Sequence, residues 1–110
     1  MIYLASPYSH PDPDVMLARF EAACRHAALL MRLGHIVFSP IAHSHPVALH
    51  GKLDALSHSI WLAQDFWFID HADEVRVLML DGWRESRGIT LEIERARNAG
   101  QLIIYDEPED

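Results

Sequence analysis

The chain has 110 residues, of which 50% are hydrophobic and 23% are charged, so it has enough apolar material for one soluble domain and no room for a second. The formal net charge of −7 argues against a protein that grips long nucleic acid or an anionic membrane surface through its overall field. The single Cys24 excludes an internal disulfide framework, and without a basic leader or a run of about 18 apolar residues we expect a cytoplasmic protein with no membrane partner.

The first half of the chain contains one strongly patterned helix after a short apolar strand. Residues 1–5 are apolar and predict the strand, which ends at a polar segment with two prolines, residues 6–11. Asp12 before Pro13 is typical of a helix start, and Gly34 is typical of a helix end. Between these signals we expect about 20 residues of amphipathic helix.

A long connection follows the second strand, which we expect over residues 35–39. From Pro40 to about Ser57 the sequence indicates no regular element apart from a short helical turn near residues 52–56. Connections of this length in compact domains are usually functional or mobile. The sequence therefore predicts a long loop in this part of the chain.

The second half alternates again between helix and strand. The expected elements, in chain order, are a helix from Ser57 to residues 71–73, a strand over 74–80, a helix from near Ser86 to Gly100, a strand over 102–105 and an acidic tail, residues 105–110. The whole order predicts an α/β fold, a flavodoxin-like three-layer sandwich with a mostly parallel sheet of about four or five strands. Residues 1–110 are expected to form one domain.

Glu92 lies beside the helix face that is expected to pack on the sheet. The apolar stripe of its helix consists of Ile89, Ile93 and Ala96. At about 100° per residue, Glu92 lies only about 60° from Ile89, at the edge of the stripe. A carboxylate early in a helix that follows a parallel strand lies near the carboxyl end of that strand, where open α/β sheets bind ligands. Glu92 is therefore a candidate catalytic residue; the alternative is a surface glutamate whose head group reaches solvent.

The start of the same helix is a candidate anion site. Ser86 is suited to cap the helix, Gly88 permits close approach of a ligand, and unpaired backbone N–H groups at a helix start attract negative charge. Arg19 and Arg84 are candidate phosphate partners near the predicted mouth of the sheet, with solvated surface charge as the alternative.

Asp65 is the second candidate carboxyl group. It shares a helical face with Trp61 and Ile69, so we expect partial desolvation, which raises the pKa of a carboxyl group. A protonated carboxyl group can act as a general acid while a second one, in a more polar setting, stays ionised and acts as a nucleophile. Cleavage at an anomeric carbon uses such a pair. The alternative is that Asp65 caps or hydrogen-bonds a neighbouring loop.

Aromatic and histidine side chains supply further candidates. Tyr3, Tyr8 and Trp83 lie at or near predicted strand ends, where an aromatic ring can stack on a flat ligand. Four histidines gather in the long connection and at its end, namely His43, His45, His50 and His58. Their spacing matches no zinc motif, so we expect no metal and no cofactor.

Three short motifs together resemble the nucleoside 2-deoxyribosyltransferase superfamily. They are the run Ile-Tyr-Leu-Ala-Ser-Pro-Tyr at residues 2–8, the pattern D-x3-I-x3-D formed by Asp65, Ile69 and Asp73, and the spacing of Ser86, Gly88, Glu92 and Ala96. They follow the expected order over most of the chain, which looks like a small bacterial branch of that superfamily. The resemblance implies a flavodoxin-like fold, assembled as a homodimer or homotetramer, that cleaves the N-glycosidic bond of a small nucleoside or nucleotide.

The resemblance also implies roles for individual residues. Glu92 takes the place of the nucleophile that attacks C1′ of the sugar, Asp65 that of the carboxyl group that handles the base, and Tyr3 that of the tyrosine that positions the nucleophile. Ser86 stands where the transferases have an acidic residue and where the similar 2′-deoxynucleoside 5′-monophosphate N-hydrolases have a phosphate-binding serine. A serine at a helix start accepts a phosphate that an aspartate would repel. The expected substrate-binding residues are Ser86, Gly88, Ser6, Tyr8, Arg19 and Trp83.

The sequence therefore supports one hypothesis with two alternatives. We expect cleavage of the N-glycosidic bond of a (deoxy)nucleoside 5′-monophosphate or a modified nucleotide through Glu92. The alternatives are a nucleoside 2-deoxyribosyltransferase that exchanges bases, and a non-catalytic nucleotide-binding module. An apolar helix face around Leu62, Phe66 and Trp67 is consistent with a dimer in which a partner chain completes the site.

Overall fold

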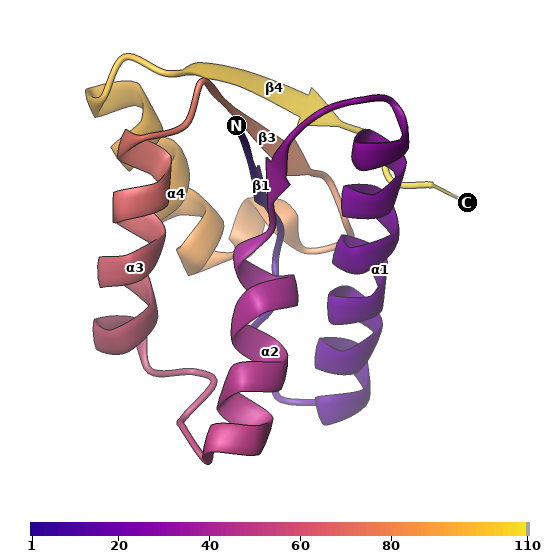
Figure 1. The fold of residues 1–110 in the computed structure, drawn as a ribbon. Helices are drawn as coiled ribbons and strands as arrows, with labels where there is room; N and C mark the ends of the chain where they lie inside the picture. Colours follow the sequence, from indigo (N-terminus) through magenta and orange to yellow (C-terminus); the bar gives the residue numbers. More distant parts are fainter. Residues whose placement is uncertain (110) are drawn as a thin grey trace.

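A parallel sheet forms the middle layer of the structure, a computed structural model that describes residues 1–109 apart from the side chain of His58. Its strands are β1 (Ile2–Ala5), β2 (Val37–Phe38), β3 (Glu74–Leu78) and β4 (Leu102–Asp106). They lie in the spatial order β2-β1-β3-β4, and every neighbouring pair is parallel. The predicted flavodoxin-like α/β sandwich is therefore confirmed, with a sheet of four strands (Figure 1).

Helices cover both faces of this sheet (Figure 1). They are α1 (Pro13–Arg32), α2 (Pro40–Gly51), α3 (His58–Asp70) and α4 (Arg87–Asn98), with a short 3-10 turn, η1 (Trp83–Glu85), before α4. One face packs against α1, the other packs against α3 and α4, and α2 lies beside α1 and β1. Among the described residues, no helix combines the length and the apolar character that a membrane crossing needs.

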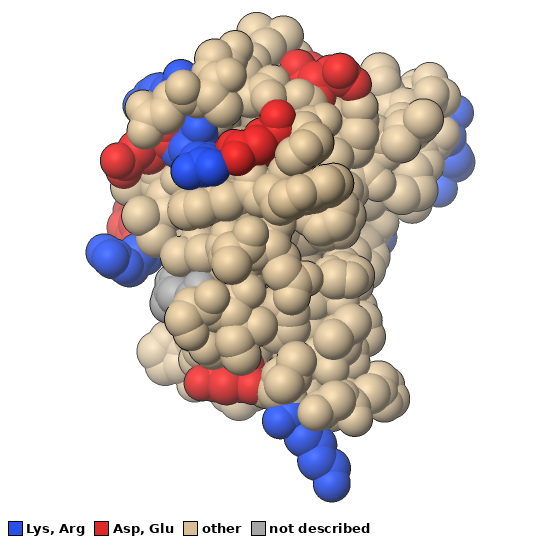
Figure 2. Space-filling view, turned by 60° about the vertical axis from the view of Figure 1, so that its left-hand side comes forward, with Lys and Arg blue, Asp and Glu red and all other residues tan. Residues whose placement is uncertain are grey.

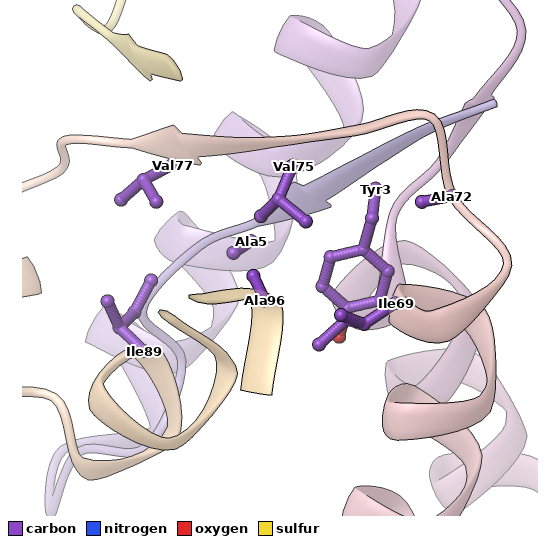
Figure 3. Close-up of a cluster of buried hydrophobic side chains, with 8 residues drawn as sticks. All are labelled: Tyr3, Ala5, Ile69, Ala72, Val75, Val77, Ile89 and Ala96. Carbon is purple, nitrogen blue, oxygen red and sulfur yellow. The ribbon is translucent and has the colours of Figure 1, made fainter. Parts of the chain in front are cut away.

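The two core clusters follow from the alternation of side chains along β1. Tyr3 and Ala5 point to the α3 and α4 side and join a cluster with side chains of β3 and both helices (Figure 3). Ile2 and Leu4 point to the α1 side. A central strand of a parallel sheet is covered on both faces, so all four residues of β1 are buried. The strand after which the first loop opens is thus held rigidly in the middle of the molecule.

The residues that the sequence predicts to begin and end helices do so at both ends of α1 and at the start of α4. The Asp12 carboxylate accepts a hydrogen bond from the backbone N–H of Asp14 at 2.9 Å, and Pro13 occupies the first turn. Gly34, with φ of 95°, follows the end of α1. Ser86 caps α4 by accepting a hydrogen bond from the N–H of Ile89 at 3.3 Å. The predicted limits of these helices are confirmed to within two residues.

The prediction of a long loop after β2 is wrong, because Pro40–Gly51 forms a helix. The Ser39 hydroxyl caps it by accepting from the N–H of Ala42 at 3.2 Å, and Pro40 stands at its first position. The sequence pattern did not predict this helix because it contains Pro46, and a proline inside a helix weakens it. Packing of the helix on α1 and β1, with Ala48 buried, compensates for that weakness. The helical turn expected near residues 52–56 is an irregular turn instead.

Candidate active site

A cavity of about 180 Å³ opens at the carboxyl ends of the strands. Its polar side is formed by the loop after β1 and by the start of α4, with Ser6, Ser9, Ser86 and Gly88 in the lining. Its apolar side is formed by α2, α3 and the connection between them, with Ile41, Leu56, Trp61 and Leu62. Asp65 and Glu92 line the same cavity. The structure thus brings both candidate carboxyl groups to one hollow at the ligand-binding edge of the sheet.

Glu92 is held by a tyrosine from the central strand. It is only 5% exposed, and the fully buried Tyr3 hydroxyl donates a hydrogen bond to its Oε2 atom. Burial, followed by the nearby charge of Glu92, raises the pKa of Tyr3 well above its ordinary value, so the phenol stays protonated and serves as a donor. Tyr3 therefore fixes the orientation of the Glu92 carboxyl group.

Burial raises the pKa of both cavity carboxyl groups. The pKa of Asp65 rises to about 7 through desolvation. The pKa of Glu92 rises to about 8, first through desolvation and then through the charge of Asp65, while the hydrogen bond from Tyr3 lowers it. The desolvation expected for Asp65 is present. The more polar setting expected for the nucleophile is not, because Glu92 is the more deeply buried of the two.

The Asp65 charge acts on Glu92, so the two groups titrate as a coupled pair. Near neutral pH such a pair retains about one proton, because ionising the second group places two negative charges in a desolvated hollow. A pair of carboxyl groups of which one is protonated can supply an acid and an ionised nucleophile in the same site.

Gly88 leaves bare backbone between the helix cap and the carboxyl pair. A Cβ atom at Gly88 would lie 3.9 Å from Ser86 Oγ and 3.9 Å from Glu92 Oε1. The first turn of α4, with its N–H groups and the positive end of its dipole, therefore faces the cavity next to Glu92. That an anion binds at this helix start stays a prediction.

Ser6 brings a buried hydroxyl group to the lining of the cavity. It is 3% exposed, and its Oγ atom has no hydrogen-bond partner among the residues that the structure describes. Leaving a buried hydroxyl unpaired costs about 1–3 kcal/mol. Ser6 lines the cavity, and its buried hydroxyl keeps a hydrogen-bonding capacity that no described protein group uses.

Several residues expected at the site lie outside the cavity lining. The Arg19 guanidinium donates to two backbone carbonyl oxygens, those of Ser9 and Asp81. Trp83 packs against Tyr105 with ring centroids 5.5 Å apart, and the Arg84 guanidinium lies over its ring. Tyr8 does line the cavity, and its hydroxyl is 2.6 Å from Nδ1 of His45.

Sequence reasoning missed the contribution of α2 and the segment after it. Ile41 and Ser44 of α2, and Ala55 and Leu56 beyond it, all line the cavity. The signal that would have found them is Ser39 followed by proline, a helix cap and first position directly after a strand. Among the described residues, no three or more His, Cys, Asp or Glu side chains gather in a group suited to a metal ion.

Comparison with known proteins places the chain in a family. A search of curated proteins found no match. Residues 1–107 match the family described as Domain of unknown function (DUF1937), which is nearly the whole chain, so the protein belongs to that family.

Proposed function

We propose that this protein cleaves the N-glycosidic bond of a (deoxy)nucleoside 5′-monophosphate or a modified nucleotide, releasing a free base and a sugar phosphate. The observation that carries the proposal is the pair Glu92 and Asp65, two desolvated carboxyl groups in one cavity with a tyrosine bonded to the former. The likeness of the chain's motifs to the nucleoside 2-deoxyribosyltransferase superfamily supports the same reading.

The proposed reaction has two steps. In the first, the Glu92 carboxylate attacks C1′, an ester forms between them, and the electron pair of the C1′–N bond leaves with the base, which takes a proton from Asp65. In the second, the Asp65 carboxylate accepts a proton from water, whose oxygen attacks C1′ and releases Glu92. The sum consumes one water molecule and restores both carboxyl groups.

In the proposed reactive form Asp65 is protonated and Glu92 is ionised. The hydrogen bond donated by Tyr3 stabilises that form, because it is strongest when Glu92 is charged. Binding of a base next to Asp65 favours it further, since a protonated carboxyl group can donate to a ring nitrogen. Tyr3 therefore stabilises the arrangement with the proton on Asp65, against the burial and the Asp65 charge that raise the pKa of Glu92.

The two sides of the cavity suit the two ends of a nucleotide. Ser6, Ser86 and the backbone at Gly88 provide hydroxyl and N–H donors for phosphate. The opposite side, with Trp61 and Leu62, is suited to the flat face of a base. The cavity volume of about 180 Å³ is below the range of about 300–1,000 Å³ typical of drug-sized ligands, so a bound nucleotide would fill the cavity and extend beyond it toward solvent.

The decisive experiment measures base release by liquid chromatography from a panel of ribo- and deoxynucleotides, including modified bases. Wild type is compared with Glu92→Gln and with Glu94→Gln, a control that alters an exposed carboxylate two residues away on the same helix. Glu92→Gln should lower the rate by about a thousandfold or more, and Glu94→Gln should leave it unchanged. Equal release by wild type and Glu92→Gln, or no release from any substrate, contradicts the proposal.

The same assay separates the two alternatives. A nucleoside 2-deoxyribosyltransferase uses the same carboxyl pair and would transfer the sugar to a second free base faster than to water. A non-catalytic nucleotide-binding module would bind nucleotide tightly and release no base.

We propose further that the active form is a homodimer or homotetramer in the cytoplasm. Trp67 is 56% exposed and Ile60 is 38% exposed, both on α3. In the view of Figure 2 the charged side chains lie mostly along the borders and the middle of the surface carries few of them. Exposed apolar side chains of this kind favour self-association. Light scattering of wild type and Trp67→Lys tests this, because a charge at the contact should shift the mass toward the monomer.

A further inference from the structure

One arginine joins the two loops that carry the polar side of the cavity. Arg19 lies on α1, and its Nη1 atom donates to the carbonyl oxygen of Ser9 at 3.0 Å. Its Nη2 atom donates to the carbonyl oxygen of Asp81, also at 3.0 Å. Ser9 belongs to the loop after β1, residues 6–12, and Asp81 belongs to the loop after β3, residues 79–86, which leads into α4. One planar guanidinium thus spans segments separated by 72 residues, and its fixed fork sets the spacing of both carbonyl groups.

Gly82 lets the second loop approach the arginine this closely. A Cβ atom at Gly82 would lie 2.7 Å from Nη2 of Arg19, which is shorter than the non-bonded contacts that Cβ atoms make in proteins. Gly82 also has φ of 87°, in the left-handed region that favours glycine. Glycine at this position is therefore needed both for the turn itself and for the contact with Arg19.

The first loop has a second anchor on its other side. The Tyr8 hydroxyl is bonded to Nδ1 of His45 on α2, and the His45 ring stacks on Phe20 of α1 with centroids 4.1 Å apart. The loop that carries Ser6 is therefore tied to α2 by Tyr8 and to the loop after β3 through Arg19.

We propose that Arg19 is a positioning residue that holds the loops 6–12 and 79–86 in register, so that Ser6 and Ser86 face one ligand across the cavity. Arg19 acts through the backbone of the two loops and does not touch the ligand. The proposal deepens the proposed function and rests on it for its kinetic consequence alone, since the coupling of the loops is a property of the protein without substrate.

Amide hydrogen exchange, followed by mass spectrometry, tests the coupling without any assumption about activity. We compare wild type with Arg19→Met, Arg19→Lys and the control Arg25→Met, which alters an exposed arginine on the same helix. In Arg19→Met, peptides from both loops should exchange about tenfold faster or more, because each loop opens without its tie. Arg19→Lys should fall in between, and Arg25→Met should match wild type. Unchanged exchange in Arg19→Met, or a response in one loop only, overturns the proposal.

The kinetic consequence is a rise in KM that exceeds the fall in kcat. Loops that are no longer held in register weaken binding, while Glu92 and Asp65 keep their own surroundings, so KM for base release should rise about tenfold and the pH profile should stay in place. A large loss of kcat with unchanged KM would contradict a positioning role. If wild type releases no base from any nucleotide, the proposed function fails and the exchange experiment still decides the role of Arg19.

A double-mutant cycle tests the contact between Arg19 and Gly82. Gly82→Ala should lower Tm more in wild type than in the Arg19→Ala background, because only the strain of the left-handed backbone remains once the guanidinium is removed. An equal drop in both backgrounds would show that the close approach of the loop to Arg19 does not matter.

Discussion

The hydroxyl group of Tyr3 donates a hydrogen bond to Oε2 of Glu92, which joins the central strand β1 to helix α4 across 89 residues of sequence. This bond favours the ionised form of a carboxyl group that burial and Asp65 otherwise push toward the neutral form. Removing the hydroxyl without altering the ring isolates its contribution.

Tyr3→Phe should raise the pKa of Glu92 further, because desolvation remains and the one contact that lowers the pKa is lost. The acidic limb of the pH profile for base release should move to higher pH, and the rate near pH 7 should fall about tenfold or more. Tyr105→Phe, which alters a half-exposed tyrosine on β4, is the control and should behave as wild type. A Tyr3→Phe profile that overlays the wild-type profile would argue against an electrostatic role for the bond.

The carboxyl pair should make the protein less stable as pH rises. The folded protein raises the pKa of Asp65 to about 7 and that of Glu92 to about 8, from ordinary values near 4. Between these pKa values the folded state therefore binds more protons than the unfolded state. The contribution of the pair to the free energy of unfolding is at its maximum below about pH 4 and is lost as pH rises through about 7 and 8.

The substitution Asp65→Asn tests this, because it removes one titrating charge and relieves its repulsion of Glu92. The Tm of Asp65→Asn relative to wild type should rise by about 5 °C or more between about pH 5 and about pH 8. Glu94→Gln, at an exposed position, should show no such trend. A pH-independent difference for Asp65→Asn would mean that the Asp65 carboxyl group does not titrate in this range.

Gly88→Ala should separate stability from ligand binding. The added Cβ would meet Ser86 Oγ and Glu92 Oε1 at ordinary van der Waals distances of 3.9 Å, so the fold tolerates it. Alanine in place of glycine within a helix stabilises by about 0.5–1 kcal/mol. The methyl group occupies the space where a phosphate would approach α4, so KM for a nucleotide should rise about tenfold while Tm is unchanged or higher. An unaltered KM would place the phosphate elsewhere.

Ser6→Ala should also stabilise the protein and weaken nucleotide binding, but for a different reason. Its Oγ is buried and without a partner in the described part of the chain, so removal should stabilise the protein by about 1 kcal/mol. If Ser6 donates to the ligand, nucleotide affinity should fall about tenfold, as measured by calorimetry. Ser59→Ala, at an exposed position at the start of α3, should change neither quantity. Unchanged affinity in Ser6→Ala would remove Ser6 from the binding site.

The sequence by itself determined the parts of this protein that depend on neighbours along the chain. The cap and first proline of α1, the apolar run of β1 and the stripe of α4 are local signals, and the alternation of elements predicts a parallel sheet whose loops open at one edge. The position of Glu92 at the edge of its stripe follows from helix geometry alone.

Only the tertiary structure decided the rest, because contacts between distant segments outweigh local preference. Helix α2 contains Pro46 and forms because its inner face packs on α1 and β1. Arg19 was expected at a phosphate, yet its guanidinium reaches two carbonyl groups that no local pattern reveals. Burial of Glu92 beyond that of Asp65 depends on how Tyr3 and α3 close around it, since desolvation is a property of the packed molecule and not of the residue or its spacing.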